Sequence, residues 1–317
     1  MRKYVIRRLL LIFPTALLLS LLIFGLLRVV PGDAALMLLT DEGSKADPEV
    51  LKALRHRLGL DRPLHVQYVT WLWDMVRGNF GESLVSRVSI GDQILQRLPL
   101  TLQIALMAQF MSLLIGVPIG IISAVRRNTW LDYALRVVSI LFLTAPTFWV
   151  GLLIVLVGAI WFNYSPPIGY NLIWDKPIEN ILQLMWPAII LASHGLATTA
   201  RMTRSTMLEV MGEDYIRTAR AKGLRESIVV FRHALKNALI PVVTLTGLSF
   251  AGLLGGTVVL EFIFGIPGIG SWLVQSIQTH DYSVVQSLVV VLAVTFMLIN
   301  LLVDLFYGWL DPRISYS

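Results

Sequence analysis

A basic, polar segment at residues 201–236 holds most of the side chains that could bind a partner. It carries eight Lys or Arg and four Asp or Glu, and it lies between two long apolar stretches. Arg217 and Arg220 are three residues apart, so they share one face of a helix. Such a face could dock into an acidic or carbonyl-lined cleft of another protein. The alternative is an ordinary loop whose arginines meet lipid headgroups.

The sequence contains no comparable set of candidate catalytic residues. The sequence contains no Gly-x-x-x-x-Gly-Lys-Ser/Thr phosphate loop, so we do not expect the chain to hydrolyse ATP. No Ser/His or paired-carboxylate constellation lies at a plausible depth in the apolar segments. The absence of cysteine excludes disulfides and thiolate metal sites. We therefore predict a chain that is not an enzyme, with no catalytic residue, bound cofactor or metal.

The elements that must position residues 201–236 are membrane spans. Apolar residues make up 56% and charged residues 15% of the chain, whereas soluble proteins have roughly a quarter of their residues charged. A span needs about 20 mostly apolar residues. Six windows qualify, namely about 9–30, 100–123, 134–160, 181–199, 238–260 and 284–306. The first is too long, and lacks the cleavage pattern, for a signal peptide.

Lys and Arg in the loops predict the orientation of these spans. The N-terminus, the loop after the second span, residues 201–236 and the C-terminal tail together hold sixteen, whereas the short loops 161–180 and 261–283 hold only Lys176. Cytoplasmic loops are the positive ones, so both termini are expected in the cytoplasm. The net charge of +6 follows this sidedness, and nucleic acid is not expected as a partner.

Within residues 201–236, a short helix at about 214–222 is predicted. Glu213 and Asp214 favour a helix N-terminus, and Gly223 is a natural left-handed stop. Ala219 and Ala221 are small enough to let a partner's surface come close. A second basic helix is expected from Arg225 to Lys236. The residues expected to couple to a partner are Glu213, Asp214, Tyr215, Arg217, Thr218, Ala219, Arg220, Ala221, Lys222, Gly223 and Leu224.

Residues 31–99 are expected to form an external helical cap. Asp47 and Pro48 begin one helix, which ends at Gly59, and Pro63 begins another, which ends near Gly78. Its aromatic side chains could be interfacial anchors, or they could line the entrance for a ligand or a docking protein. The residues concerned are Tyr68, Trp71, Trp73 and Phe80.

Several spans contain residues that weaken helices, which fits a bundle that rearranges. Such residues let helices kink or approach closely. They could border a solute path, although plain packing is the alternative for any one of them. They are Gly116, Pro118, Gly120, Pro146, Gly252, Gly255 and Gly256. Charged groups that would mark an ion path lie only near span ends, at Arg28, Arg136 and Asp304, and His194 alone lies well inside a span.

Sequence motifs resemble the binding-protein-dependent ABC transporter permeases, and specifically the first permease subunit of the dipeptide, oligopeptide and nickel subfamily. Residues 214–224 (DYIRTARAKGL) and 232–244 (RHALKNALIPVVT) resemble its cytoplasmic coupling loop. The further landmarks are residues 2–15, 30–33, 58–64, 78–83, 264–270 and 310–313. The broader family has Glu-Ala-Ala, three residues and then Gly. Here Arg217, Thr218 and Ala219 stand at those places, a departure that looks usual for the peptide subfamily.

The resemblance implies an all-α permease of the type I importer fold in the bacterial inner membrane. Residues 1–99 would be the first span and cap, and residues 100–317 the five-span core. The implied partners are a second permease, two ATPase subunits that use ATP and Mg²⁺, and an extracytoplasmic binding protein. Di- or oligopeptides are the expected solute. Nickel chelates, glutathione-like compounds, opines and sugars are alternatives, as are a stand-alone secondary transporter and a scaffold without a solute path.

Overall fold

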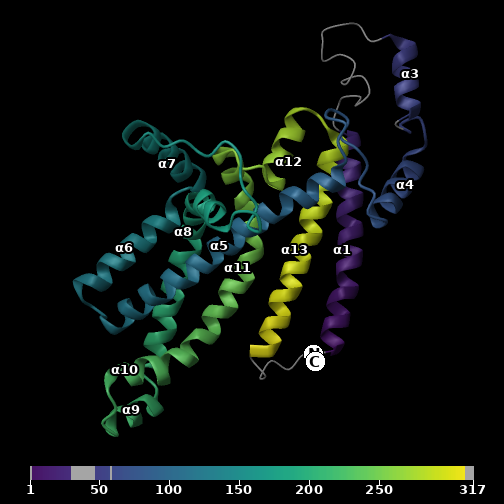
Figure 1. The fold of residues 1–317 in the computed structure, drawn as a ribbon. Helices are drawn as coiled ribbons and strands as arrows, with labels where there is room; N and C mark the ends of the chain where they lie inside the picture. The colour runs from purple at the N-terminus through teal and green to yellow at the C-terminus, as the bar shows by residue number, and fades with distance from the viewer. Residues whose placement is uncertain (1, 30–46, 58, 311–317) are drawn as a thin grey trace. The chain divides into compact units, whose positions relative to one another are not determined.

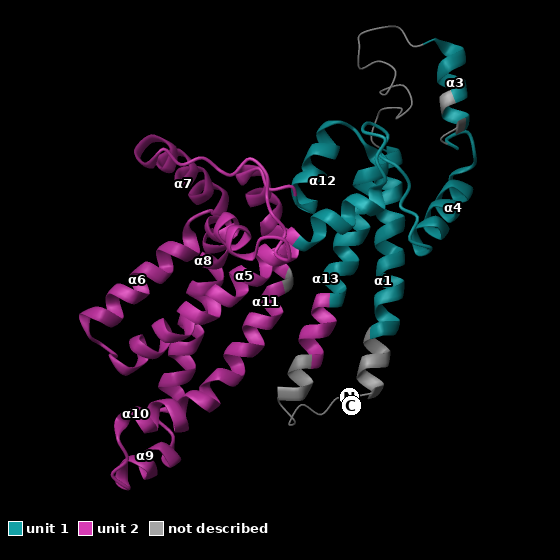
Figure 2. Ribbon diagram, viewed as in Figure 1, with its two compact units in different colours: residues 1–99, 268–298 teal, residues 100–267, 299–317 magenta. Residues whose placement is uncertain are grey.

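The computed structural model describes residues 2–29, 47–57 and 59–310, and its regular elements are all helices (Figure 1). Residues 1–99 with 268–298 form one compact unit, and residues 100–267 with 299–317 form a second (Figure 2). Residues 268–298 lie in the first compact unit. The landmarks at 30–33 and 311–313 lie outside the described residues.

Thirteen elements follow one another in the described part of the chain. They are α1 (Arg2–Val29), α3 (Pro48–Arg57), α4 (Leu64–Val76), α5 (Ile90–Val125), α6 (Trp130–Thr144), α7 (Thr147–Phe162), α8 (Pro177–Val210), α9 (Asp214–Ala221), α10 (Glu226–Ile228), the π-helix η1 (Val229–Ala234), α11 (Leu235–Phe264), α12 (Ile269–Gln278) and α13 (Tyr282–Leu310). The two helices predicted in the cap, before Gly59 and before Gly78, are present as α3 and α4.

Five helical segments are long and apolar enough to cross a membrane by themselves. They are Leu9–Val29, Ile90–Val125, Pro177–Val210, Glu226–Phe250 and Tyr282–Leu305. Two broken pairs, α6 with α7 and residues 252–264 with α12, also pass when each is taken as one span. The described residues therefore hold five to seven candidate spans.

The predicted window 134–160 is not one continuous helix. The chain turns by 97° between α6 and α7. Ala145 has ψ 122°, an extended value, because the ring of Pro146 disfavours the helical region for the residue before it. With 15 and 16 residues, each half is about 22 to 24 Å long at about 1.5 Å per residue. Each half alone is therefore shorter than the roughly 30 Å hydrocarbon core.

The first unit is held by one apolar cluster and one buried carboxylate. Ile90, Trp272 and Leu288 pack together from α5, α12 and α13. Asp281 immediately precedes α13 in the sequence. It is buried and accepts a hydrogen bond from the hydroxyl of Ser83. The segment between α4 and α5 is thereby tied to the start of α13.

The second unit has its core where α5, α8 and α11 meet. Ile104, Leu184 and Leu260 are fully buried there, one from each helix. A second cluster lies where α5 and α8 end and α11 begins, and it includes residues of α9 and η1. This second cluster fixes the polar segment that the sequence singles out.

Candidate functional site

Helix α9 is anchored by two apolar side chains and offers its other side to solvent. Ile216 and Ala219 are buried against Val229 and Val230 of η1. The remaining residues of the helix are exposed. Ala219 was expected to leave room for a partner, but its small size instead lets α9 pack against its own chain. Figure 1 shows α9 and α10 at the end where α8 finishes and α11 begins.

The predicted stop of this helix is confirmed. Gly223 has φ +75°, in the left-handed region, and α9 ends at Ala221. A Cβ atom built on Gly223 would meet nothing within 4 Å. The requirement for glycine is therefore one of backbone conformation.

The charges of α9 are partly used within the chain. Arg217 Nη1 donates to Asp214 Oδ1 at 3.2 Å on the exposed surface. Arg220 makes two hydrogen bonds to the carboxylate of Glu226, at 3.2 Å and 2.8 Å, and so bridges the turn at Gly223. The hydrogen bond to Glu226 raises the pKa of Arg220. Arg220 therefore holds the loop together, which leaves less of it for a partner than the sequence suggests.

Four other basic residues of 201–236 do not form such ion pairs. Lys222, Arg225, Arg232 and Lys236 form no ion pair within residues 47–57 and 59–310. Tyr215 accepts a hydrogen bond from Asn237 Nδ2 at 2.8 Å, which ties α9 to the start of α11. These cations and the exposed side of α9 form one basic surface, and the Tyr215–Asn237 hydrogen bond fixes its position on α11.

The predicted second basic helix from Arg225 to Lys236 is only partly right. Glu226–Ile228 is one α-helical turn, and Val229–Ala234 is a π-helix that runs into α11. Val229, Val230 and Ala234 face the buried cluster. A π-helix has i→i+5 hydrogen bonds, and single π-helical turns within α-helices are frequent at functional sites. Composition and hydropathy have no signal for it.

A buried ion pair, not predicted from the sequence, links α8 to the α5–α6 turn. Asp132 is fully buried and accepts hydrogen bonds from Arg204 Nε at 2.8 Å and Nη2 at 2.9 Å. Ser123 Oγ and the backbone N–H of Asn128 donate to the same carboxylate. The end of α5, the start of α6 and α8 are thus joined at one point. Thr129 caps α6 three residues earlier, but nothing local identifies Arg204.

Gly116 and Gly120 are packing residues between α5 and α8. A Cβ atom on Gly116 would lie 2.9 Å from the carbonyl oxygen of Leu196, and one on Gly120 would lie 2.6 Å from that of Ala200. Small residues allow this close approach of helices in membranes. The structure therefore supports the packing alternative for these two glycines.

The other helix-weakening residues lie differently. Pro146 stands at the turn between α6 and α7, and Pro118 is exposed on α5. A Cβ atom on Gly252 or Gly255 would meet nothing within 4 Å, whereas one on Gly256 would clash with Leu191. Gly252 and Gly255 thus leave an open strip along α11.

A second buried acid also escaped the sequence analysis. Glu261 lies near the end of α11, is fully buried, and accepts a hydrogen bond from Thr101 Oγ1 at 2.7 Å. Its position just after the predicted window 238–260 concealed it.

The aromatic residues of the cap divide into two groups. Tyr68 and Trp71 pack on Phe24 of α1, at 5.3 Å and 6.2 Å between ring centroids, and the Tyr68 hydroxyl lies 2.9 Å from Ser20 Oγ. Trp73 is exposed and stacks with Arg77. Phe80 packs on the apolar cluster of the first unit. Tyr68 and Trp71 therefore anchor α4 to α1, and of the four predicted aromatic residues only Trp73 is exposed.

Comparisons with known proteins extend over the whole chain. Residues 116–316 match the family described as binding-protein-dependent transport system inner membrane component, and residues 1–105 match its N-terminal part. The di/tripeptide transport system permease protein DppB of Pseudomonas aeruginosa is 39% identical, and the dipeptide transport system permease protein DppB of Escherichia coli K12 is 36% identical. Both alignments cover 100% of each chain.

Solved structures show the same fold. The inward-facing methionine ABC transporter MetNI matches with a TM-score of 0.57 at 19% identity, over 69% of this chain and 96% of that chain. An amino acid ABC transporter matches with a TM-score of 0.53 at 16% identity, over 69% and 94%. In this family the membrane component is not catalytic, and ATP is hydrolysed by partner subunits. The chain therefore belongs to the binding-protein-dependent transport system inner membrane components, as a multi-pass permease subunit of an ABC importer.

Proposed function

We propose that the chain imports di- or oligopeptides as one of two paired permeases and that α9 couples it to the ATPase subunits. The observation that carries the coupling role is the construction of α9. Ile216 and Ala219 are buried, so the helix is held in place and its exposed side is mostly polar. The peptide substrate rests on full-length relatives that are named as peptide permeases.

The proposed topology has six spans, with α6 and α7 counted together as the third, and both termini in the cytoplasm. The concentration of Lys and Arg in residues 201–236 and at the N-terminus supports it. Residues 31–99 form the external cap, where a solute-binding protein would dock. Trp73 is the exposed aromatic of that surface.

The proposed solute path lies on the side of α11 that carries Gly252 and Gly255. The space beside these two glycines is open, whereas α8 occupies the space beside Gly116 and Gly120. The second permease of a heterodimer would complete the path. Residues 1–99 supply the first span and cap, and residues 100–317 the five-span core.

Transport by the reconstituted complex tests this function. Proteoliposomes would contain both permeases and the ATPase subunits, with the binding protein supplied on the outer side. We expect ATP-driven uptake of a labelled dipeptide. Unlabelled dipeptides should compete with this uptake, whereas a nickel chelate, glutathione or a sugar should not. Uptake of one of these competitors in place of the dipeptide would overturn the substrate assignment.

Charge reversal on α9 tests the coupling role in the same vesicles. The double variant Arg217→Glu with Lys222→Glu should still enter the membrane but lose most ATP-driven uptake, because both side chains lie on the exposed surface. Arg126→Glu with Arg127→Glu is the matched control, since these arginines are exposed outside α9. Equal uptake by wild type and the α9 variant would refute the role.

A further inference from the structure

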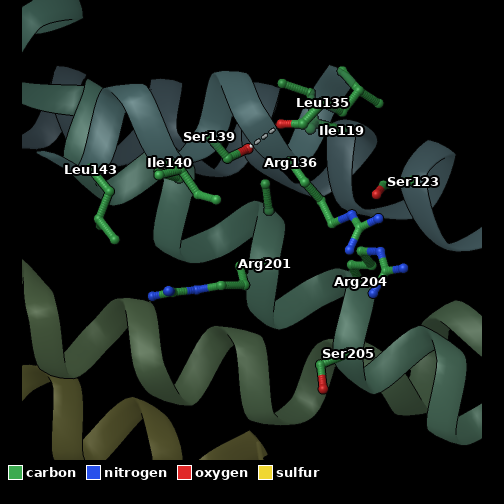
Figure 3. A pocket seen from close by; sticks show the side chains of 12 residues that line it. Ile119, Ser123, Leu135, Arg136, Ser139, Ile140, Leu143, Arg201, Arg204 and Ser205 are labelled. Carbon is green, nitrogen blue, oxygen red and sulfur yellow. Dashed lines mark hydrogen bonds between the residues drawn. The ribbon is translucent and has the colours of Figure 1, made fainter. Parts of the chain in front are cut away.

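A cavity of about 260 Å³ lies between α5, α6 and α8 in the second unit (Figure 3). Its polar lining consists of three arginines, Arg136, Arg201 and Arg204, and three serines, Ser123, Ser139 and Ser205. None of the described residues that line it is acidic. The cavity takes no part in the coupling role of α9 or in the proposed path along α11.

The positive charge of this cavity is only partly neutralised. Arg204 is paired with Asp132 through two hydrogen bonds. Arg136 Nε is 3.5 Å from the same carboxylate and has no hydrogen-bond partner, although it is buried. Two of the three guanidinium groups therefore retain donors for an anion.

Arg201 is the second of these groups. It is exposed and makes no hydrogen bond or ion pair within the described parts of the chain. Figure 3 shows its side chain running away from Arg204, toward the side on which Leu143 lies. One Asp against three Arg leaves a local excess of two positive charges at the cavity.

The rest of the lining is apolar. Ile119, Leu135, Ile140 and Leu143 form it together with two alanines. Such walls do not suit a small hydrated anion, which needs polar groups on all sides. They do suit a ligand with a charged head and a hydrocarbon tail.

The cavity also lies at the depth where such ligands occur. Arg204 is six residues before the end of α8 at Val210, which is about 9 Å at 1.5 Å per residue. Ser123 is two residues before the end of α5. These ends lead into α9 and the positive loops, and on the proposed function they face the cytoplasm, where the leaflet is rich in anionic lipid.

We propose that this cavity binds the phosphate headgroup of an anionic phospholipid of the cytoplasmic leaflet. Arg136 and Arg201 donate to the phosphate oxygens, and an acyl chain lies along Leu135, Ile140 and Leu143. Arginine binds phosphate well because its planar fork can donate two hydrogen bonds at once. The orientation toward the cytoplasm rests on the proposed function, whereas the binding chemistry rests on the cavity alone.

Native mass spectrometry of the purified transporter complex tests the proposal. The complex would be titrated with phosphatidylglycerol and, separately, with phosphatidylcholine. We expect wild type to retain phosphatidylglycerol in preference. Arg136→Gln with Arg201→Gln should bind it at least about ten-fold more weakly, which is about 1.4 kcal/mol, because both guanidinium donors to the phosphate are lost. Arg126→Gln with Arg127→Gln removes the same charge outside the cavity and should bind like wild type.

Two further arms identify the source of the phosphate. Inorganic phosphate at the same concentration should not displace phosphatidylglycerol, and displacement would overturn the lipid assignment in favour of a soluble anion. Arg136→Lys with Arg201→Lys keeps the charge and should recover part of the binding. An equal loss in the Arg126/Arg127 variant, or no loss in the cavity variant, would overturn the site.

Failure of this proposal is distinguishable from failure of the proposed function. Lipid retention is measured without transport, and peptide uptake is measured in separate vesicles. A complex that imports dipeptides while its cavity variant retains phosphatidylglycerol normally would refute only the lipid site. Copurification of the ATPase subunits with each variant checks that the complex has assembled.

Discussion

Asp132 and Glu226 each accept two hydrogen bonds from one arginine, yet they lie in opposite environments. The pair of Asp132 with Arg204 has a fully buried carboxylate, whereas the pair of Glu226 with Arg220 has both side chains substantially exposed. The same chemical contact therefore has two uses. The buried pair fixes α5, α6 and α8 to one another, and the exposed pair shapes a surface that a partner can reach.

Removing the arginine of each pair should give very different losses of stability. Arg204→Met removes both guanidinium hydrogen bonds of the buried Asp132, leaves only Arg136 Nε at 3.5 Å, and should lower the free energy of unfolding by about 3–5 kcal/mol. Arg220→Met should lower it by less than about 1 kcal/mol, because water solvates an exposed carboxylate. Thermal unfolding of the purified complex in detergent measures both. Comparable losses would mean that burial does not distinguish the two pairs.

A double substitution sharpens this comparison. Arg204→Met with Asp132→Leu removes both charges and should recover most of the stability, since a buried ion pair can often be replaced by apolar residues. If the double variant is as unstable as Arg204→Met alone, the loss comes from packing and not from the unpaired charge.

Glycine substitutions in two helices should have the next largest effect. A Cβ atom on Gly120 would lie 2.5 Å from Thr203 Cβ, so Gly120→Ala should destabilise by about 1–3 kcal/mol through overpacking. Gly252→Ala is the matched control in α11, where the space is open. It should stabilise by about 0.5–1 kcal/mol because alanine favours helix. Opposite signs in the same unfolding assay are the expected outcome.

At Gly223 we expect a modest loss of stability together with a loss of coupling. Gly223→Val forces a β-branched residue to φ +75°, at a strain of roughly 1–2 kcal/mol. Because Gly223 has open space around it, this strain arises from the backbone alone. Gly223→Val should reduce ATP-driven uptake more than Ala221→Val does. Equal effects would mean that bulk on this surface, and not the turn, disturbs coupling.

The contrast between the pairs also explains what the sequence could predict. Helix α9 and its stop at Gly223 depend on neighbouring residues, so local patterns were sufficient. Asp132 and Arg204 are 72 residues apart, and no periodicity connects them. The spans follow from hydropathy, which reports that a segment is buried in lipid or protein but not the direction of its helix axis. The 97° turn at Pro146 and the fit of Gly120 against Ala200 therefore required the fold.

The π-helix η1 likewise could not be predicted from its own residues. Val229 to Ala234 have the apolar and basic residues of an ordinary amphipathic helix, and a prediction from composition gives an α-helix there. What selects the wider turn is the burial of Val229, Val230 and Ala234 together in the cluster beneath α9. That cluster is assembled from four other segments of the chain.

Site-directed cross-linking tests the coupling role of α9 most directly. The sequence has no cysteine, so single cysteines at Arg217, Thr218 and Lys222 can carry a thiol-reactive photo-cross-linker in the assembled complex. We predict adducts with an ATPase subunit from these three exposed positions, and none from Trp73 on the cap, which is the control. Adducts with the ATPase from Trp73, with none from α9, would contradict both the coupling role and the orientation.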